Sequence, residues 1–131
     1  FLLCQAAVEG MEKKGWGRIV NISSIFGKIS KTGRAAYSAS KFALDGLTVA
    51  LSAEYSSRGI LANCVAPGFI DTSLTRKMLS NAEINDLVSR VPIGRLGEAK
   101  EIANLVLWLS SAENTFTTGQ NIAIDGGFTR V

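Results

Sequence analysis

Short, unbroken apolar runs alternate along the chain with longer segments whose apolar residues recur at helical spacing. Strands are predicted at the short runs, over residues 18–23, 60–66 and 121–124. Helices are predicted over residues 1–14, 35–57 and 98–110. In the last helix, Ile102, Leu105 and Leu109 recur at i, i+3 and i+7, so they share one face.

This order of elements predicts an α/β fold. Strands that are apolar on both faces need helices on both sides, which is typical of a parallel sheet. The helix from residue 35 is dense in small residues, so we expect it to be sandwiched between neighbouring elements. Only three strands are visible, and residues 69–97 are mixed and more polar. No repeat or low-complexity linker divides the 131 residues, which fits a single domain.

Tyr37 and Lys41 are four residues apart, which places them one turn apart on one face of the predicted helix. An ammonium group beside a phenol favours the phenolate, whereas an unperturbed tyrosine titrates near ~10. The pair is therefore a candidate acid/base, although surface helices also carry such pairs without function. Ser23 and Ser24 strengthen the candidate, because they end a buried strand, where open α/β sheets place their sites.

Composition removes several classes of function. The net charge is +3, but the cations are scattered and form no basic stripe with interleaved aromatics, which argues against nucleic-acid binding. No apolar run is long enough to span a membrane. The chain has no histidine, which excludes Ser-His-Asp and Cys-His mechanisms and histidine-containing metal sites. Cys4 and Cys64 are predicted to be buried, reduced thiols, which fits the cytoplasm.

Three glycine-bearing segments are candidate ligand loops. Gly15-Trp16-Gly17 has valine where a dinucleotide fingerprint needs its third glycine, and it precedes a strand instead of following one. The segment 27–33 lacks the Lys-Ser/Thr pair of a P-loop. No loop for dinucleotide phosphates is therefore predicted. Pro67-Gly68, after a strand, is either a plain turn or a rigid turn that exposes backbone groups to a ligand.

Four segments in this order and at these spacings resemble the short-chain dehydrogenase/reductase family. They are Arg18-Ile19-Val20-Asn21-Ile22-Ser23-Ser24, Tyr37-Ser38-Ala39-Ser40-Lys41, Val65-Ala66-Pro67-Gly68 and Asp125-Gly126-Gly127. The nearest branch is that of 3-oxoacyl-carrier-protein reductases and related sugar or alcohol dehydrogenases. The resemblance implies that residues 1–131 are the C-terminal half of a doubly wound, parallel-sheet Rossmann fold. The nucleotide-binding half of the family is expected to precede Phe1, consistent with the missing initiator methionine.

The resemblance also implies catalytic roles. Tyr37 would donate a proton to the substrate carbonyl during reduction. Lys41 would lower the pKa of Tyr37 and bind the nicotinamide ribose of NAD or NADP. Ser24, rather than Ser23, would bind and orient the carbonyl oxygen, because it has the family's spacing to the tyrosine.

Further expectations concern cofactor, substrate and partners. Residues Pro67, Gly68, Ile70 and Thr72 would line the nicotinamide, with the Ile70 backbone near its carboxamide. Residues 72–92, called the lid below, would be mobile and cover the substrate. The substrate would be a small-molecule or carrier-bound carbonyl compound. The helix from residue 35 would pair with its mate in a homo-oligomer, a dimer or tetramer.

Two alternatives to the carrier-protein reductase hypothesis remain open. The chain could be a non-catalytic truncated product or an interaction module, since it lacks a nucleotide loop and alone is expected to be inactive. It could also belong to a sugar or polyol dehydrogenase of the same family. Nothing between Thr72 and Pro92 decides the substrate, and nothing in the chain decides between NAD and NADP.

Overall fold

A three-stranded parallel sheet forms the centre of the molecule in a computed structural model that describes residues 1–131. Its order is β1-β2-β5, with β1 at Gly17–Ile22, β2 at Ile60–Pro67 and β5 at Asn121–Ile124. Both strand pairs are parallel, and the register places Ile22 opposite Val65 and Pro67 opposite Ile124. The predicted strands and their parallel arrangement are confirmed, within one residue at each end.

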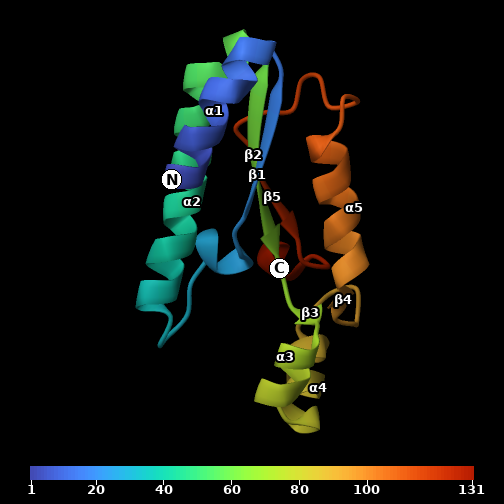
Figure 1. Cartoon of the computed structure of the whole chain (residues 1–131). Helices are drawn as coiled ribbons and strands as arrows, with labels where there is room; N and C mark the ends of the chain where they lie inside the picture. The colour runs from blue at the N-terminus through green and yellow to red at the C-terminus, as the bar shows by residue number, and fades with distance from the viewer.

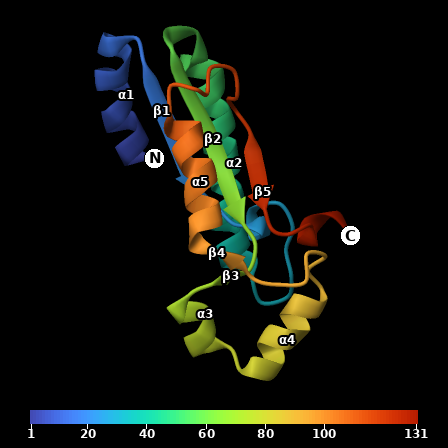
Figure 2. The same ribbon diagram turned by 90° about the vertical axis from the view of Figure 1, so that its right-hand side faces the viewer.

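Helices cover both faces of this sheet (Figure 1). The helices α1 (Leu2–Lys14) and α2 (Ala35–Tyr55) lie on one face, and α5 (Ala99–Ser110) lies on the other (Figures 1 and 2). β2 is buried along nearly its whole length because it is the central strand between two helical layers. The α/β prediction is therefore confirmed. The helix predicted to reach residue 57 ends at Tyr55 and continues as a 3-10 turn, η2 (Ser56–Arg58).

One apolar cluster joins α1 and α2 to the sheet. Its buried members are Val8, Ile19, Leu51, Ile60 and Ala62. The half-buried Cys4 packs against this cluster, so the prediction that both thiols are buried is wrong for Cys4 and right for Cys64. Cys4 lies near the exposed start of α1, where only Val8 is fully buried, so the helix covers its thiol incompletely.

The polar stretch after β2 forms a separate small unit. Two short strands, β3 (Ile70–Asp71) and β4 (Gly97–Glu98), form a parallel pair. Between them in the sequence lie helices α3 (Ser73–Met78) and α4 (Asn81–Ser89). The two helices project beyond the carboxyl ends of the main strands (Figure 1). Both begin at a side-chain cap, from Thr72 for α3 and from Ser80 for α4.

Two further 3-10 turns follow main strands, η1 (Ile25–Gly27) after β1 and η3 (Phe128–Arg130) after β5. Both lie at the carboxyl edge of the sheet, as does the Pro67-Gly68 turn after β2. This edge is therefore where loops from all three strands converge. None of the helices combines the length and the apolar character needed to cross a bilayer.

Candidate active site

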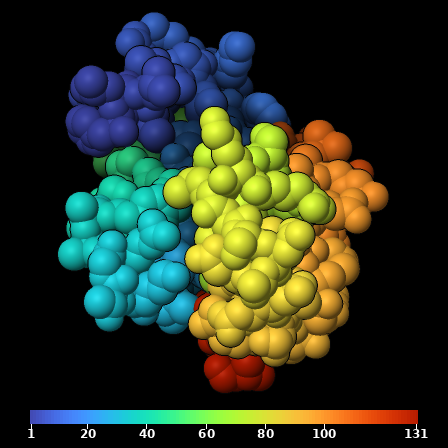
Figure 3. All heavy atoms as spheres, turned by 90° about the horizontal axis from the view of Figure 1, so that it is seen from below, coloured from blue at the N-terminus to red at the C-terminus, as the bar shows by residue number.

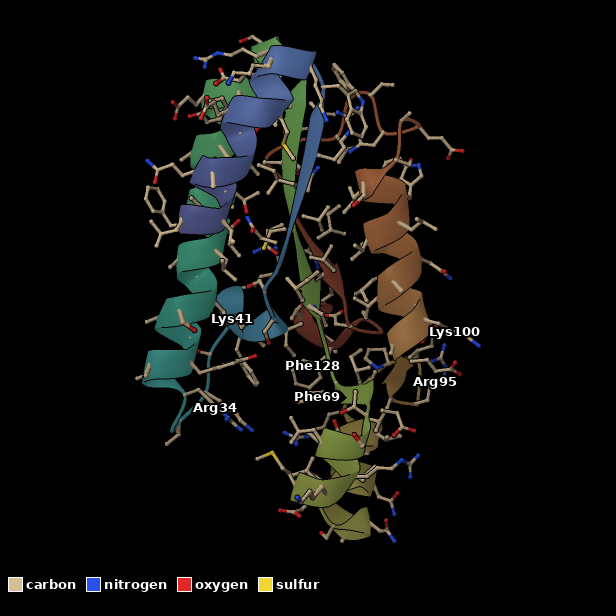
Figure 4. All side chains as sticks on the ribbon, viewed as in Figure 1. Arg34, Lys41, Phe69, Arg95, Lys100 and Phe128 are labelled. Atoms are coloured by element: carbon tan, nitrogen blue, oxygen red, sulfur yellow. The ribbon has the colours of Figure 1, made fainter.

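Lys41 ties α2 to the carboxyl end of β1. Its Nζ donates a hydrogen bond to the carbonyl oxygen of Ile22, the last residue of β1, at 3.1 Å. The same Nζ lies 5.7 Å from the ring centroid of Tyr37, one turn earlier on α2. Figure 4 shows the Lys41 side chain extending from α2 towards the loop that follows β1. The predicted pairing of Tyr37 and Lys41 on one helix face is therefore present, and both side chains reach the end of the sheet.

The two serines after β1 have different partners. The Ser23 hydroxyl is buried and donates to the backbone carbonyl of Lys41 at 3.0 Å, so it holds α2 against the strand. The Ser24 oxygen accepts a hydrogen bond from the Phe26 backbone N–H at 3.2 Å and so caps η1. The Ser24 hydroxyl proton remains available, because a hydroxyl can donate one hydrogen bond while it accepts another.

Gly27 permits the close approach of α2 to this loop. A Cβ at Gly27 would lie 2.5 Å from the Ser23 hydroxyl oxygen and 2.8 Å from the Lys41 carbonyl oxygen. A second contact, between the Ser30 and Ser38 hydroxyls at 2.8 Å, fastens the loop to the first turns of α2. The position of the Tyr37 and Lys41 side chains relative to Ser24 thus depends on buried polar contacts and on one missing side chain.

The Pro67-Gly68 turn packs directly against the chain after β5. The Gly68 N–H donates to the Ile124 carbonyl at 2.9 Å, and a Cβ at Gly68 would lie 2.7 Å from the Cα of Asp125. Burial acts to raise the pKa of Asp125, but hydrogen bonds from Thr129 and Gly127 outweigh it, so the pKa lies below its ordinary value. The Asp125-Gly126-Gly127 segment therefore braces the Pro-Gly turn.

Ile70 and Thr72 lead away from this edge into the lid. Ile70 pairs with Gly97, and its carbonyl accepts a hydrogen bond from the Thr75 hydroxyl at 2.7 Å. The Thr72 hydroxyl caps α3 by accepting from the Thr75 N–H at 3.1 Å. Both residues hold the first turn of the lid in this structure, so their predicted contact with a nicotinamide stays a prediction.

A row of aromatic rings, not predicted from the sequence, extends from Tyr37 across the edge of the sheet. Tyr37 packs edge-to-face on Phe26 at 6.3 Å, Phe26 on Phe69 at 6.4 Å, and Phe69 on Phe128 at 5.0 Å between centroids. Each phenylalanine follows the end of one main strand, β1, β2 or β5. An aromatic residue shortly after every strand was the signal in the sequence that could have predicted this aromatic row.

A hollow lies at the far end of the aromatic row. It has a volume of about 580 Å³ and is lined by Ile29, Ser89, Arg90, Pro92, Phe128 and Val131. These residues come from the loop before α2, the end of the lid and the end of the chain. Seen from below, the loop and the start of α2 (cyan) lie beside the lid (yellow), with the end of the chain (red) beyond them (Figure 3). The hollow is in the size range of small-molecule sites.

The candidate catalytic groups differ in their exposure to solvent. Tyr37 is 42% exposed, although its ring rests on the nearly buried Phe26. Ser24 is buried, with 8% of its surface exposed. The arrangement thus combines an accessible phenol, an ammonium beside it and a sheltered hydroxyl, all at the carboxyl end of one strand. Such a set can bind a carbonyl oxygen and deliver a proton to it.

Known protein sequences match this chain over almost its whole length. The family model described as enoyl-(acyl carrier protein) reductase matches residues 1–129. The 3-oxoacyl-(acyl-carrier-protein) reductase FabG of Pseudomonas aeruginosa is 44% identical over 127 residues, which cover 97% of this chain and 51% of that protein. The acetoacetyl-CoA reductase of Cupriavidus necator is 39% identical over 127 residues, with the same coverage. The chain spans about half the length of the curated relatives it matches.

Solved structures of dehydrogenases also superpose on almost the whole chain. A gluconate 5-dehydrogenase from Burkholderia cenocepacia, in complex with NADP and tartrate, superposes with a TM-score of 0.91 at 35% identity, covering 97% of this chain and 50% of that one. An acetoin dehydrogenase from Enterobacter cloacae superposes with a TM-score of 0.85 at 40% identity, covering 98% and 50%.

Proposed function

Because the chain belongs to the short-chain dehydrogenase/reductase family, we propose that it carries the catalytic residues of an NAD(P)-dependent oxidoreductase that interconverts a carbonyl and an alcohol. The observation that carries the proposal is that Tyr37 and Lys41, one turn apart on α2, contact the end of β1 and the turn η1 that Ser24 caps. The identity to 3-oxoacyl-(acyl-carrier-protein) reductases favours a 3-oxoacyl group as the substrate.

In this proposal each of the three residues has a separate role in the proton transfer. The Ser24 hydroxyl donates a hydrogen bond to the carbonyl oxygen and stabilises the negative charge that develops there. The Tyr37 hydroxyl delivers its proton to the same oxygen. The ammonium of Lys41, 5.7 Å from the Tyr37 ring, stabilises the phenolate that remains. In the oxidation direction the same groups act in reverse.

The residues present fit the nicotinamide end of a dinucleotide. An ammonium group has three donors, and Lys41 uses one on Ile22, which leaves two for ribose hydroxyls. The Pro67-Gly68 turn stands at the end of the central strand, where Rossmann folds bind ligands, and we propose that Ile70 and Thr72 extend that contact. When bound, the nicotinamide supplies the hydride. We further propose that residues 1–131 work as the C-terminal part of one larger Rossmann domain.

The decisive test replaces Tyr37 by phenylalanine in the complete protein that contains this chain. Loss of the only proposed proton donor should lower kcat for ketone reduction by at least ~100-fold. Tyr55, the second tyrosine of the chain, lies at the other end of α2, so Tyr55→Phe is the matched control and should retain full turnover. Substantial reduction by a folded Tyr37→Phe protein would sink the assignment.

A cofactor titration separates the enzyme from the alternative of a non-catalytic module. No glycine-rich phosphate loop occurs in residues 1–131, so NADH or NADPH should not bind specifically to this chain alone. The complete protein should bind one of the two, as measured by fluorescence titration. Failure of both cofactors to bind the complete protein would favour the non-catalytic alternative.

A sugar or polyol dehydrogenase is the second candidate, favoured by the likeness to the gluconate 5-dehydrogenase structure. The two candidates differ only in substrate. Initial rates with a 3-oxoacyl thioester and with a keto sugar acid, measured on the complete protein with NADH and NADPH, distinguish them and also decide the cofactor.

We also propose that the complete protein is a homo-oligomer, a dimer or tetramer, in the cytoplasm. Exposed apolar side chains on the outer layer support this, among them Leu2 and Leu3 of α1 and Phe42 and Val49 of α2. Both cysteines are free thiols, as expected in a reducing compartment. Light scattering after size-exclusion chromatography measures the oligomeric state directly.

A further inference from the structure

The segment that carries the candidate catalytic residues is unusual in its charge. Between Lys13 and Leu44 the chain contains no aspartate or glutamate, whereas lysines and arginines recur throughout. Three of these cations, Lys28, Lys31 and Arg34, lie on the loop before α2 and make no ion pair. The lid and its flank differ, since Arg76, Arg90 and Arg95 each pair with a carboxylate. Unpaired positive charge is therefore concentrated on the loop before α2, whereas in the lid only Lys77 lacks an ion pair.

Arg34 shares a helix face with the catalytic pair. It immediately precedes α2, and its spacing to Tyr37 and Lys41 is i, i+3 and i+7. Figure 4 shows its side chain at the start of α2, below Lys41, on the side where the lid lies. This spacing places Tyr37 between Arg34 and Lys41 along one face of α2.

Lys31 is held close to Arg34 by a turn. The Arg34 N–H donates to the Lys31 carbonyl at 3.2 Å, and Gly33 within the turn has a φ of +77°. The Lys31 Nζ lies 5.6 Å from the ring centroid of Phe26, and that ring in turn packs on Tyr37. Lys28, by contrast, is engaged, since its Nζ donates to the Asn121 carbonyl at 2.8 Å. Lys31 and Arg34 are therefore the two cations of the loop whose side chains donate no hydrogen bond and form no ion pair, and Lys31 lies beside the ring on which Tyr37 packs.

A purely structural role does not explain Arg34. The position before a helix favours serine, threonine, aspartate or asparagine, and a cation there is opposed by the helix dipole. Arg34 makes no capping bond with its side chain and is exposed. Its guanidinium has five donors without a carboxylate partner. The residue is therefore better explained by something that binds it than by the stability of α2.

We propose that Arg34, assisted by Lys31, binds a negatively charged group of the substrate, so that the site selects acidic carbonyl compounds. This inference rests on the proposed function, because it places the reacting carbonyl at Ser24 and Tyr37. The shared chemistry is an anionic oxygen group, for which arginine offers a planar, two-pronged match. That group is either the carboxylate of a small keto acid or the phosphate on the arm of a carrier-bound thioester.

The test compares charged and neutral substrates that share one reacting carbonyl, in the complete protein. The probes are 3-oxobutanoate, its methyl ester, the neutral N-acetylcysteamine thioester and the phosphopantetheine thioester of the same acid. Arg34→Gln should lower kcat/KM about tenfold, a loss of about 1.4 kcal/mol, for the anionic probe that the site prefers. The neutral probes should change by less than about twofold. Whether the carboxylate or the phosphate probe loses rate identifies the source of the anion.

Two controls keep the result specific. Lys14→Gln removes an unpaired charge from the end of α1, at the opposite edge of the sheet, and should change neither class of probe. Arg34→Lys should recover part of the loss. If Arg34→Gln does not fold, the unmodified protein still tests for an anion site, because at saturating cofactor a tenfold rise in salt should slow the anionic probes more than the neutral ones.

The possible failures are distinguishable. Equal effects of Arg34→Gln on charged and neutral probes, or none on either, would overturn the anion site and leave the oxidoreductase proposal standing. Undiminished reduction of the probes by a folded Tyr37→Phe protein would overturn the proposed function and this inference with it.

Discussion

Two regions face each other across the carboxyl edge of the sheet, and they are held in different ways. The loop after β1 and the start of α2 are fixed by buried polar contacts, such as Ser23 to the Lys41 carbonyl. The lid is fixed by exposed pairs, Arg76 with Asp71 and Arg90 with Asp86. Buried hydrogen bonds impose geometry, whereas exposed ion pairs contribute little and weaken in salt. The contrast suggests a rigid catalytic side and a lid that opens at low cost.

The packing of the two regions supports the same contrast. On the catalytic side, Ser23, Ser24, Ile25 and Phe26 are all buried. In the lid helices α3 and α4, Leu87 is the one buried residue. Segments with few buried apolar side chains open at lower free energy than the core. We therefore expect amide exchange to be fast in α3 and α4 and slow in β2 and the middle of α2.

The largest predicted effect is at Ser24, the second of the two adjacent serines after β1. Ser24→Ala in the complete protein should lower kcat for ketone reduction ~100- to 1,000-fold, because it removes the donor proposed for the carbonyl oxygen. The loss of its cap on η1 should cost only about 1 kcal/mol. Steady-state kinetics and urea unfolding measure the two quantities.

Ser23→Ala is the matched partner experiment, and it should lower stability by a similar amount while largely sparing turnover. The buried Ser23 hydroxyl bonds the Lys41 carbonyl, so its loss should cost about 1 kcal/mol of unfolding free energy. Turnover should fall much less than in Ser24→Ala. A larger fall in turnover in Ser23→Ala than in Ser24→Ala would show that the family spacing assigns the wrong serine.

A smaller effect is predicted at Gly27, which controls how closely α2 approaches the loop. Gly27→Ala forces a Cβ to within 2.8 Å of the Lys41 carbonyl oxygen, so α2 or the loop must shift. We expect a loss of about 1–3 kcal/mol in the unfolding free energy, together with reduced kcat.

Gly10→Ala is the control for Gly27→Ala, because a Cβ at Gly10 meets nothing within 4 Å. It lies within α1, so the change should be neutral or stabilise the protein by up to about 1 kcal/mol. Full stability and activity in Gly27→Ala would contradict the view that the catalytic side is rigidly packed.

The sheet and its helices were predictable because the apolar runs of the strands are unbroken and the apolar residues of the helices recur at helical spacing. α3 and α4 were not, since they span six and nine residues and bury almost nothing. Their signals were local caps instead. Ser80 and Glu83 form a capping box, which is visible in the sequence as serine followed three residues later by glutamate. Periodicity therefore predicts the packed elements, and capping residues predict the exposed ones.

The candidate site was likewise only partly predictable from the sequence. The spacing of Tyr37 and Lys41 is local, so the sequence alone places them on one face. The aromatic row through Phe26, Phe69 and Phe128 joins three separate strand ends, and only the tertiary fold brings the rings together. The hydrogen-bond partners of Ser23 and Ser24 also follow only from the tertiary structure, because the sequence does not show which groups each hydroxyl contacts.

Within the lid, breaking one ion pair should change motion more than stability. Arg76→Gln removes the pair between α3 and Asp71 at the end of β3. Because the pair is exposed, we expect less than about 1 kcal/mol of change in the unfolding free energy. Amide exchange in α3 should nevertheless accelerate. Lys77→Gln, next in the chain and without an ion pair, is the control and should not alter exchange. A large fall in global stability would contradict the exposed-pair interpretation of the lid.

The smallest predicted effect is a pH dependence at the flank of the lid. The Arg95 guanidinium and, next, the Glu98 backbone N–H lower the pKa of Glu101 from 4.5 to about 2. A carboxyl whose pKa falls on folding stabilises the folded state above its unfolded pKa. The contribution should therefore be present above pH 4.5 and be lost as the pH falls towards 2. Titration of side-chain carboxyls by NMR measures the pKa directly, and Arg95→Gln should raise it. The pKa of Asp125, whose hydrogen bonds come from Gly127 and Thr129, should not respond to Arg95→Gln, and an equal rise at both carboxyls would show that Arg95 acts through a general change in the fold.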